Sequence, residues 1–161
     1  MPLFFESENE FVKIEWLAER IVEIYQAYGQ MIPSIAIFLP PNEDLSRFSK
    51  TLGQLDLLCD IGINVVPCEN GQILGDKNSV RVFSIDYVKG LEFEAAFFHN
   101  IDNLFEGKKI SKTDEDLLLK NIYVGLSRAA FYLGVTCSDS NRIGFIAEAF
   151  SRDKLTWSLM N

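Results

Sequence analysis

The stretch VRVFSIDYVKGLEFEAAFF (residues 80–98) decides the fold, because two short apolar runs flank a polar segment that carries a lysine and a glycine. The runs at 80–85 and 94–100 are rich in β-branched and aromatic residues, and they predict two strands. Neither run alternates apolar with polar residues, so helices are expected to cover both faces of the sheet. This pattern is typical of a parallel α/β sheet.

The rest of the chain alternates predicted helices and strands. Residues 9–28 place apolar side chains at helical spacing, with Ser7 and Glu10 able to form a capping box and Gly29 able to end the helix. Further strands are predicted at 34–40, 63–68 and 131–137, and further helices at 42–55 (capped by Asn42), 114–129 and 141–151. With no internal repeat or linker, the 161 residues are expected to form one domain (1–161).

Composition and charge narrow the class of protein. The chain is 48% apolar and 24% charged, as in soluble globular proteins, and its apolar runs are too short to span a membrane. The first ten residues lack a signal-peptide pattern, so a cytoplasmic protein is expected. The net charge of −8 disfavours DNA binding by this chain alone, because Lys and Arg supply most non-specific affinity. Three scattered cysteines and one histidine predict neither a disulfide framework nor a metal site.

The polar segment between the two strands is the first candidate site. Lys89 and Gly90 follow the strand at 80–85, and ligands of open parallel α/β sheets bind beyond the carboxyl ends of strands. Gly90 lets the backbone approach a ligand, Lys89 supplies positive charge, and Glu92 can accept hydrogen bonds from sugar hydroxyls. Taken alone, these residues fit a tight turn with a surface lysine and acid somewhat better.

The second candidate site lies in NIYVGLSRAAFYLGV (121–135), where Arg128 falls near the end of a predicted helix and just before a strand. Its planar guanidinium could face an interface and neutralise phosphate charge. The alternative is that an arginine at a helix C-terminus only complements the helix dipole.

Together the segments KGLEFEAAFF and IYVGLSRAAFYL resemble the fifth and sixth conserved motifs of UvrD/Rep-like superfamily-one helicases, in their order and separation. Residues 9–28, 34–39 and 42–55 resemble, more weakly, the opening of the second RecA-like domain of that family. The resemblance therefore covers nearly the whole chain. It implies an α/β, RecA-like fold of the P-loop-NTPase type, with a mostly parallel sheet flanked by helices.

The resemblance implies that this domain supplies half of an ATP site, shared with an N-terminal RecA-like domain that is absent from the chain. Glu92 would lie near the ribose and Arg128 would act on the γ-phosphate, stabilising charge on the transferred phosphoryl group. The remaining nucleotide-binding residues would be Lys89, Gly90, Tyr123, Gly125 and Ser127, the last in place of the usual threonine. No G-x-x-x-x-G-K-[ST] motif occurs. The phosphate cradle and the Mg²⁺ ligands are therefore expected in the absent domain, and the isolated chain is expected to be inactive.

Asp86 departs from the family pattern, because helicases of this family often carry a histidine there that contacts single-stranded DNA. The resemblance implies single-stranded or duplex DNA as a partner of the parent protein. Because an acid at this position would repel phosphate, RNA polymerase is an alternative partner, as in the helicase-D-like subgroup. A third interpretation is that the chain is a stand-alone binding module.

A hydrolase is an alternative interpretation, because GLSRA (125–129) approaches the G-x-S-x-G nucleophile elbow. Ala129 replaces the final glycine, and the single histidine, His99, precedes Ser127 instead of following it. His99, at the end of a predicted strand, is expected to be structural.

Overall fold

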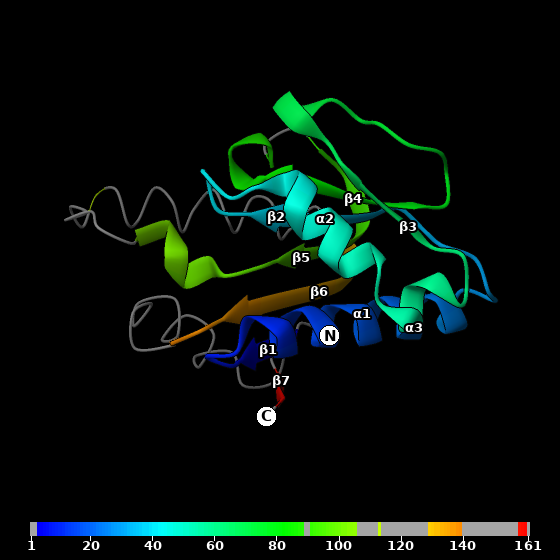
Figure 1. Ribbon diagram of the computed structural model, residues 1–161, viewed down its shortest axis with the longest axis horizontal. Helices are drawn as coiled ribbons and strands as arrows, with labels where there is room; N and C mark the ends of the chain where they lie inside the picture. The colour runs from blue at the N-terminus through cyan, green and yellow to red at the C-terminus, as the bar shows by residue number, and fades with distance from the viewer. Residues whose placement is uncertain (1–2, 89–90, 106–112, 114–128, 140–157, 161) are drawn as a thin grey trace.

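A parallel β-sheet forms the centre of the molecule (Figure 1). The computed structural model describes residues 3–88, 91–105, 113, 129–139 and 158–160. Within these residues the seven strands are β1 (Leu3–Glu6), β2 (Ile35–Leu39), β3 (Asn64–Pro67), β4 (Ser79–Ser84), β5 (Phe93–Phe98), β6 (Ala129–Cys137) and β7 (Ser158–Met160). They lie in the order β3-β4-β2-β5-β6-β1-β7, and each pair of neighbours is parallel. The predicted fold class is therefore confirmed.

The described helices are α1 (Glu10–Ala27), α2 (Leu45–Gly53) and α3 (Asp56–Cys59), with short 3₁₀ turns η1 (Glu69–Gly71), η2 (Ile85–Tyr87) and η3 (Ile101–Phe105). Within the described ranges, none of the helices has the length and apolarity that crossing a bilayer requires. The helices predicted at 114–129 and 141–151 lie outside the described residues, except that Ala129 already belongs to β6.

The ends of α1 and α2 differ in detail from the predicted ones. Asn9, and not Ser7, caps α1, because its side chain accepts a hydrogen bond from the Val12 amide. Gly29 follows the helix at φ +68°, as expected of a glycine that ends a helix. Asp44 caps α2 by accepting from the Arg47 amide, whereas Asn42 adopts a left-handed conformation in the preceding turn.

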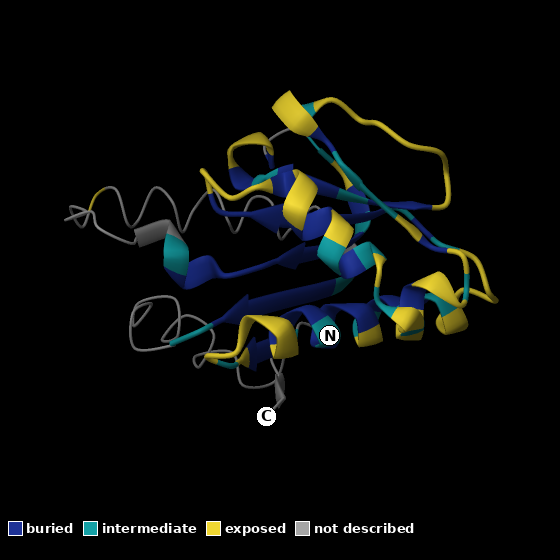
Figure 2. Cartoon of the chain, viewed as in Figure 1, coloured by how far each residue is buried: buried dark blue, intermediate teal, exposed yellow. Residues whose placement is uncertain are grey.

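Each face of the sheet has its own apolar core. Helices α1, α2 and α3 cover one face, and their inner sides are buried while their outer sides are exposed (Figure 2). On the opposite face an aromatic layer packs against residues of η2 and η3; its members are Phe38, Phe83, Phe93 and Phe98. A fully buried apolar side chain contributes roughly 1.5–3 kcal/mol. Burial on both faces explains why the strand sequences do not alternate.

Candidate functional site

Glu92, the one predicted site residue within the described ranges, lies directly before the first residue of β5, and its side chain is exposed. The next residue, Phe93, pairs in the sheet with Ala129, the first residue of β6. The residues that follow Glu92 and Arg128 in the sequence are therefore neighbours in space. Arg128 itself lies outside the described residues, as do Lys89, Gly90, Tyr123, Gly125 and Ser127.

Asp86 and Glu92, which both belong to the segment between β4 and β5, lie at opposite edges of the sheet. The sequence predicts that Lys89 and Gly90 lie beyond the carboxyl end of a strand, and both lie outside the described residues. Asp86 lies beyond the carboxyl end of β4, in η2, and its carboxylate is exposed. Glu92 lies at the opposite edge, because β5 runs parallel to its neighbours and therefore starts at the amino-terminal edge. Leu91 packs against the aromatic core as the chain reaches that edge.

The amino end of β5 is held in place by a pair of reciprocal hydrogen bonds. The Ser34 amide donates to Glu94 Oε2 at 2.9 Å, and the Glu94 amide donates to Ser34 Oγ at 2.9 Å. The Ala95 amide also donates to the Ser34 carbonyl. Glu92 lies two residues before Glu94, so its backbone is held close to a strand end that these hydrogen bonds fix in place. No motif in the sequence indicated this contact.

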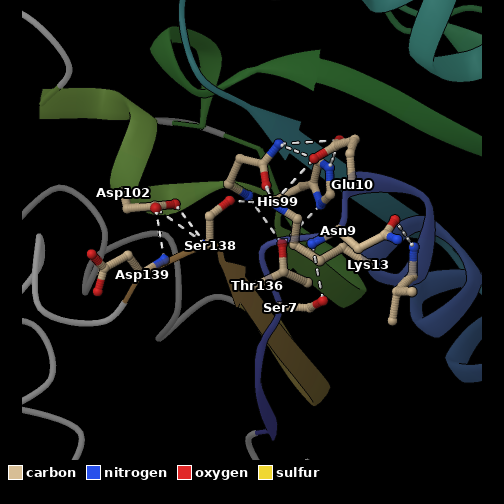
Figure 3. A network of polar contacts seen from close by, with 11 residues as sticks. Ser7, Asn9, Glu10, Lys13, His99, Asp102, Thr136, Ser138 and Asp139 are labelled. Atoms are coloured by element: carbon tan, nitrogen blue, oxygen red, sulfur yellow. Dashed lines mark hydrogen bonds and ion pairs between the residues drawn. The ribbon is translucent and has the colours of Figure 1, made fainter.

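At the carboxyl-terminal edge, a polar network joins α1 to the ends of β5 and β6 (Figure 3). Lys13 is only 1% exposed, and a buried ammonium is tolerated only when it is paired. Its Nζ donates to Asn100 Oδ1 and to Ser138 Oγ, and it lies 3.1 Å from Glu10 Oε2. These three acceptors match the three N–H bonds of the ammonium.

His99 occupies the centre of this network. It is 2% exposed, with Nε2 2.7 Å from Glu10 Oε1 and Nδ1 2.8 Å from Thr136 Oγ1. The Thr136 hydroxyl also accepts a hydrogen bond from the Asn100 amide. These partners fit the tautomer in which Nε2 donates to the carboxylate and Nδ1 accepts from the hydroxyl. The contacts are those of a structural histidine.

Asp102 closes the far side of the network. It is buried, and its carboxylate accepts hydrogen bonds from the Ser138 and Asp139 amides at the end of β6. Figure 3 shows this carboxylate facing the two residues that leave the strand. Asp102 therefore fixes the exit of β6 relative to β5.

The electrostatics of Glu10 follow from these contacts. Burial by itself raises the pKa of a carboxyl group, but here the hydrogen bonds from His99 and Asn100 and the positive charge of Lys13 lower the pKa of Glu10 to about 2. Each charged group of the network already has partners, so the arrangement suits the positioning of α1 against β5 and β6 better than proton transfer.

The part of the chain that the structure describes contains no cluster of side chains that could bind a metal ion. There, no group of three or more His, Cys, Asp or Glu side chains is placed to hold one.

Comparison with known proteins places the fold. The chain has the RecA-like α/β fold seen in helicase C-terminal domains. The C-terminal domain of a possible DNA helicase from Lactobacillus plantarum WCFS1 matches with a TM-score of 0.65 and 18% identity, over 98% of this chain and 83% of that one. The C-terminal domain of the DEAD-box protein Dbp5 matches with a TM-score of 0.52 and 11% identity, over 98% and 88%. No protein-family model matches the sequence, and no curated protein does.

Proposed function

We propose that this chain is the C-terminal motor domain of an ATP-dependent helicase of the UvrD/Rep-like type. The observation that carries the proposal is the pairing of Phe93 with Ala129, because it brings together the two segments that carry the helicase-like motifs. The likeness of the fold to two helicase C-terminal domains agrees with it. The domain would supply half of an ATP site that closes against an N-terminal RecA-like domain of the same parent protein.

The exposed carboxylate of Glu92 fits a role in nucleotide binding. No hydrogen bond or ion pair joins it to another of the described residues, so its oxygens can accept hydrogen bonds from ribose hydroxyls. Gly90 would allow close backbone approach and Lys89 would add positive charge. Tyr123, Gly125 and Ser127 would complete the nucleotide-binding surface.

Arg128 would be the catalytic residue. ATP with Mg²⁺ would supply the phosphoryl group that is transferred to water, and the Mg²⁺ ligands would belong to the N-terminal domain of the parent protein. The guanidinium of Arg128 would neutralise charge that develops on that group, an effect of roughly 10³-fold or more where such arginines have been studied. The chain alone would not turn over ATP, because it has no phosphate loop.

The substrate of the parent motor is proposed to be single-stranded or duplex DNA in the cytoplasm. Asp86 favours a second candidate, the remodelling of RNA polymerase by the same ATPase. Its exposed carboxylate lies at the carboxyl-terminal edge and would repel a phosphate backbone.

The proposal is tested by ATP turnover of the full-length parent, wild type beside Arg128→Ala and Arg128→Lys, with and without single-stranded DNA. Arg128→Ala is expected to lower turnover by about 10³-fold while nucleotide binding is largely kept. Arg128→Lys keeps the charge but lacks the planar fork, and is expected to remain impaired. Unchanged turnover in Arg128→Ala would refute the assignment. ATP turnover that depends on Arg128 but does not change when DNA is added would favour RNA polymerase as the substrate.

A further inference from the structure

The connections of the sheet change direction between β2 and β5. From β2 the chain passes through α2 to β3, on one side of β2, whereas from β5 it continues to β6, on the other side. In open parallel sheets a crevice forms beyond the carboxyl ends of two such strands, and ligands bind in it. The proposed ATP-site residue Glu92 lies at the opposite edge, so this crevice is a separate place in the molecule.

A cleft of about 470 Å³ occupies this position. Its walls come from the start of α1, from the turn and first part of α2, and from the residues after β5; they are Glu10, Phe11, Ile14, Glu43, Asp44, Arg47, Phe48, Thr51, Asn100 and Asn103. The volume lies within the range of pockets that hold small ligands, so it can accept a long side chain with its flanking backbone. The network around Lys13 underlies it and keeps Asn100 in place.

The charges around the cleft indicate which kind of ligand it can bind. Three carboxylates, those of Glu10, Glu43 and Asp44, line it together with one guanidinium, that of Arg47. The pKa of Glu10 is lowered, so this group is ionised at neutral pH. Lys13 is buried and pairs with Glu10, so these two charges cancel each other. Glu43 and Asp44 together exceed the single charge of Arg47, and this remaining negative charge attracts cations.

The apolar part of the lining suits a long basic side chain. Phe11 is 51% exposed at the cleft, which is unusual for a large aromatic residue, and Ile14 and Phe48 lie beside it. Lysine and arginine bury their methylene stems against such surfaces while the charged head remains near polar groups. An aromatic ring also attracts a cation placed over its face.

We propose that this cleft binds a basic segment of a partner protein, with one lysine or arginine side chain entering between α1 and α2. The carboxylates of Glu43 and Asp44 bind the charged head, Phe11 covers the stem, and the Asn103 amide group binds the peptide backbone. The inference does not rest on the proposed ATP site, and each can be wrong without the other.

The test measures binding of a fluorescent lysine-rich peptide to the 161-residue chain by anisotropy, beside the same peptide with glutamine at each lysine. Glu43→Lys is expected to weaken binding of the lysine peptide by about tenfold, because it reverses one charge at the cleft. Glu69→Lys is the matched control: it makes the same charge change at an exposed site outside the cleft, and less than about a twofold effect is expected. Phe11→Ala is expected to weaken binding severalfold without unfolding the chain, since Phe11 is half exposed.

The other outcomes overturn the proposal. Equal weakening by Glu43→Lys and Glu69→Lys would show attraction by overall charge instead of a site. If spermidine displaced the fluorescent peptide as effectively as the unlabelled lysine-rich peptide does, the cleft would be assigned to free polyamines. Binding of oligothymidylate in preference to the peptide, lost in Phe11→Ala, would assign it to nucleic acid.

Discussion

Lys13 at the carboxyl-terminal edge of the sheet is buried and bonded to three side chains, whereas Glu92 at the amino-terminal edge is exposed and bonded to none of the described side chains. The first group is satisfied within the chain and can only stabilise it. The second remains available to a partner. The difference separates a residue that holds the fold together from one whose side chain is free to take part in the proposed ATP site.

The largest effect on stability is expected from removing Lys13. Lys13→Ala leaves the buried Asn100 side chain and Ser138 without this donor, and leaving a buried polar group unsatisfied costs about 1–3 kcal/mol. Urea unfolding followed by circular dichroism measures the loss. Lys50→Ala, at an exposed position of α2, is the control and should stay within about 0.5 kcal/mol of wild type. A loss below about 1 kcal/mol in Lys13→Ala would show that the network does not hold the edge together.

A smaller effect is expected at the amino-terminal edge. Ser34→Ala removes the hydroxyl that accepts from the Glu94 amide, and a single hydrogen bond of this kind contributes about 1 kcal/mol. The same unfolding measurement applies, with Ser46→Ala on the exposed side of α2 as control. If Ser34→Ala cost as much as Lys13→Ala, the contrast between the two edges would fail.

The smallest effect concerns the pH dependence of Glu10. Its folded-state pKa of about 2 lies below the ordinary value of 4.5, so ionised Glu10 stabilises the fold above pH 4.5. That contribution is lost as the pH falls from 4.5 towards 2. Because Glu10 is half exposed, solvent screening should keep the contribution below about 1 kcal/mol. Glu10→Gln should therefore be less stable than wild type at pH 6 and equal to it near pH 2. A stability difference that stays constant with pH would contradict this assignment.

Much of the fold could be predicted from the sequence. The strands β2 to β6 and the helix α1 lie close to their predicted positions, because each is a continuous apolar run or has clear helical spacing. The strand β1 (Leu3–Glu6) was missed, since four residues carry little periodic signal and it forms by pairing between β6 and β7. The cap of α2 was also wrong, because Asn42 and Asp44 are equally good caps in sequence and only the turn geometry distinguishes them.

The proposed ATP site rests on local motifs and stays a prediction. Glu92 and Arg128 belong to short segments that resemble helicase motifs, so the sequence pointed to both. The network around Lys13 could not be predicted, because it joins residues up to 125 positions apart, as in the contact between Lys13 and Ser138. A lysine within an amphipathic helix otherwise predicts a solvent-exposed side chain.

Complementation tests the central claim most directly. The 161-residue chain and the separately produced N-terminal part of its parent are assayed for ATP turnover, each alone and then mixed. The account predicts that neither turns over ATP alone, that the mixture does, and that the mixture containing the Arg128→Ala chain does not. Turnover by this chain alone, or equal turnover with Arg128→Ala, would contradict the claim that it supplies half of a shared ATP site.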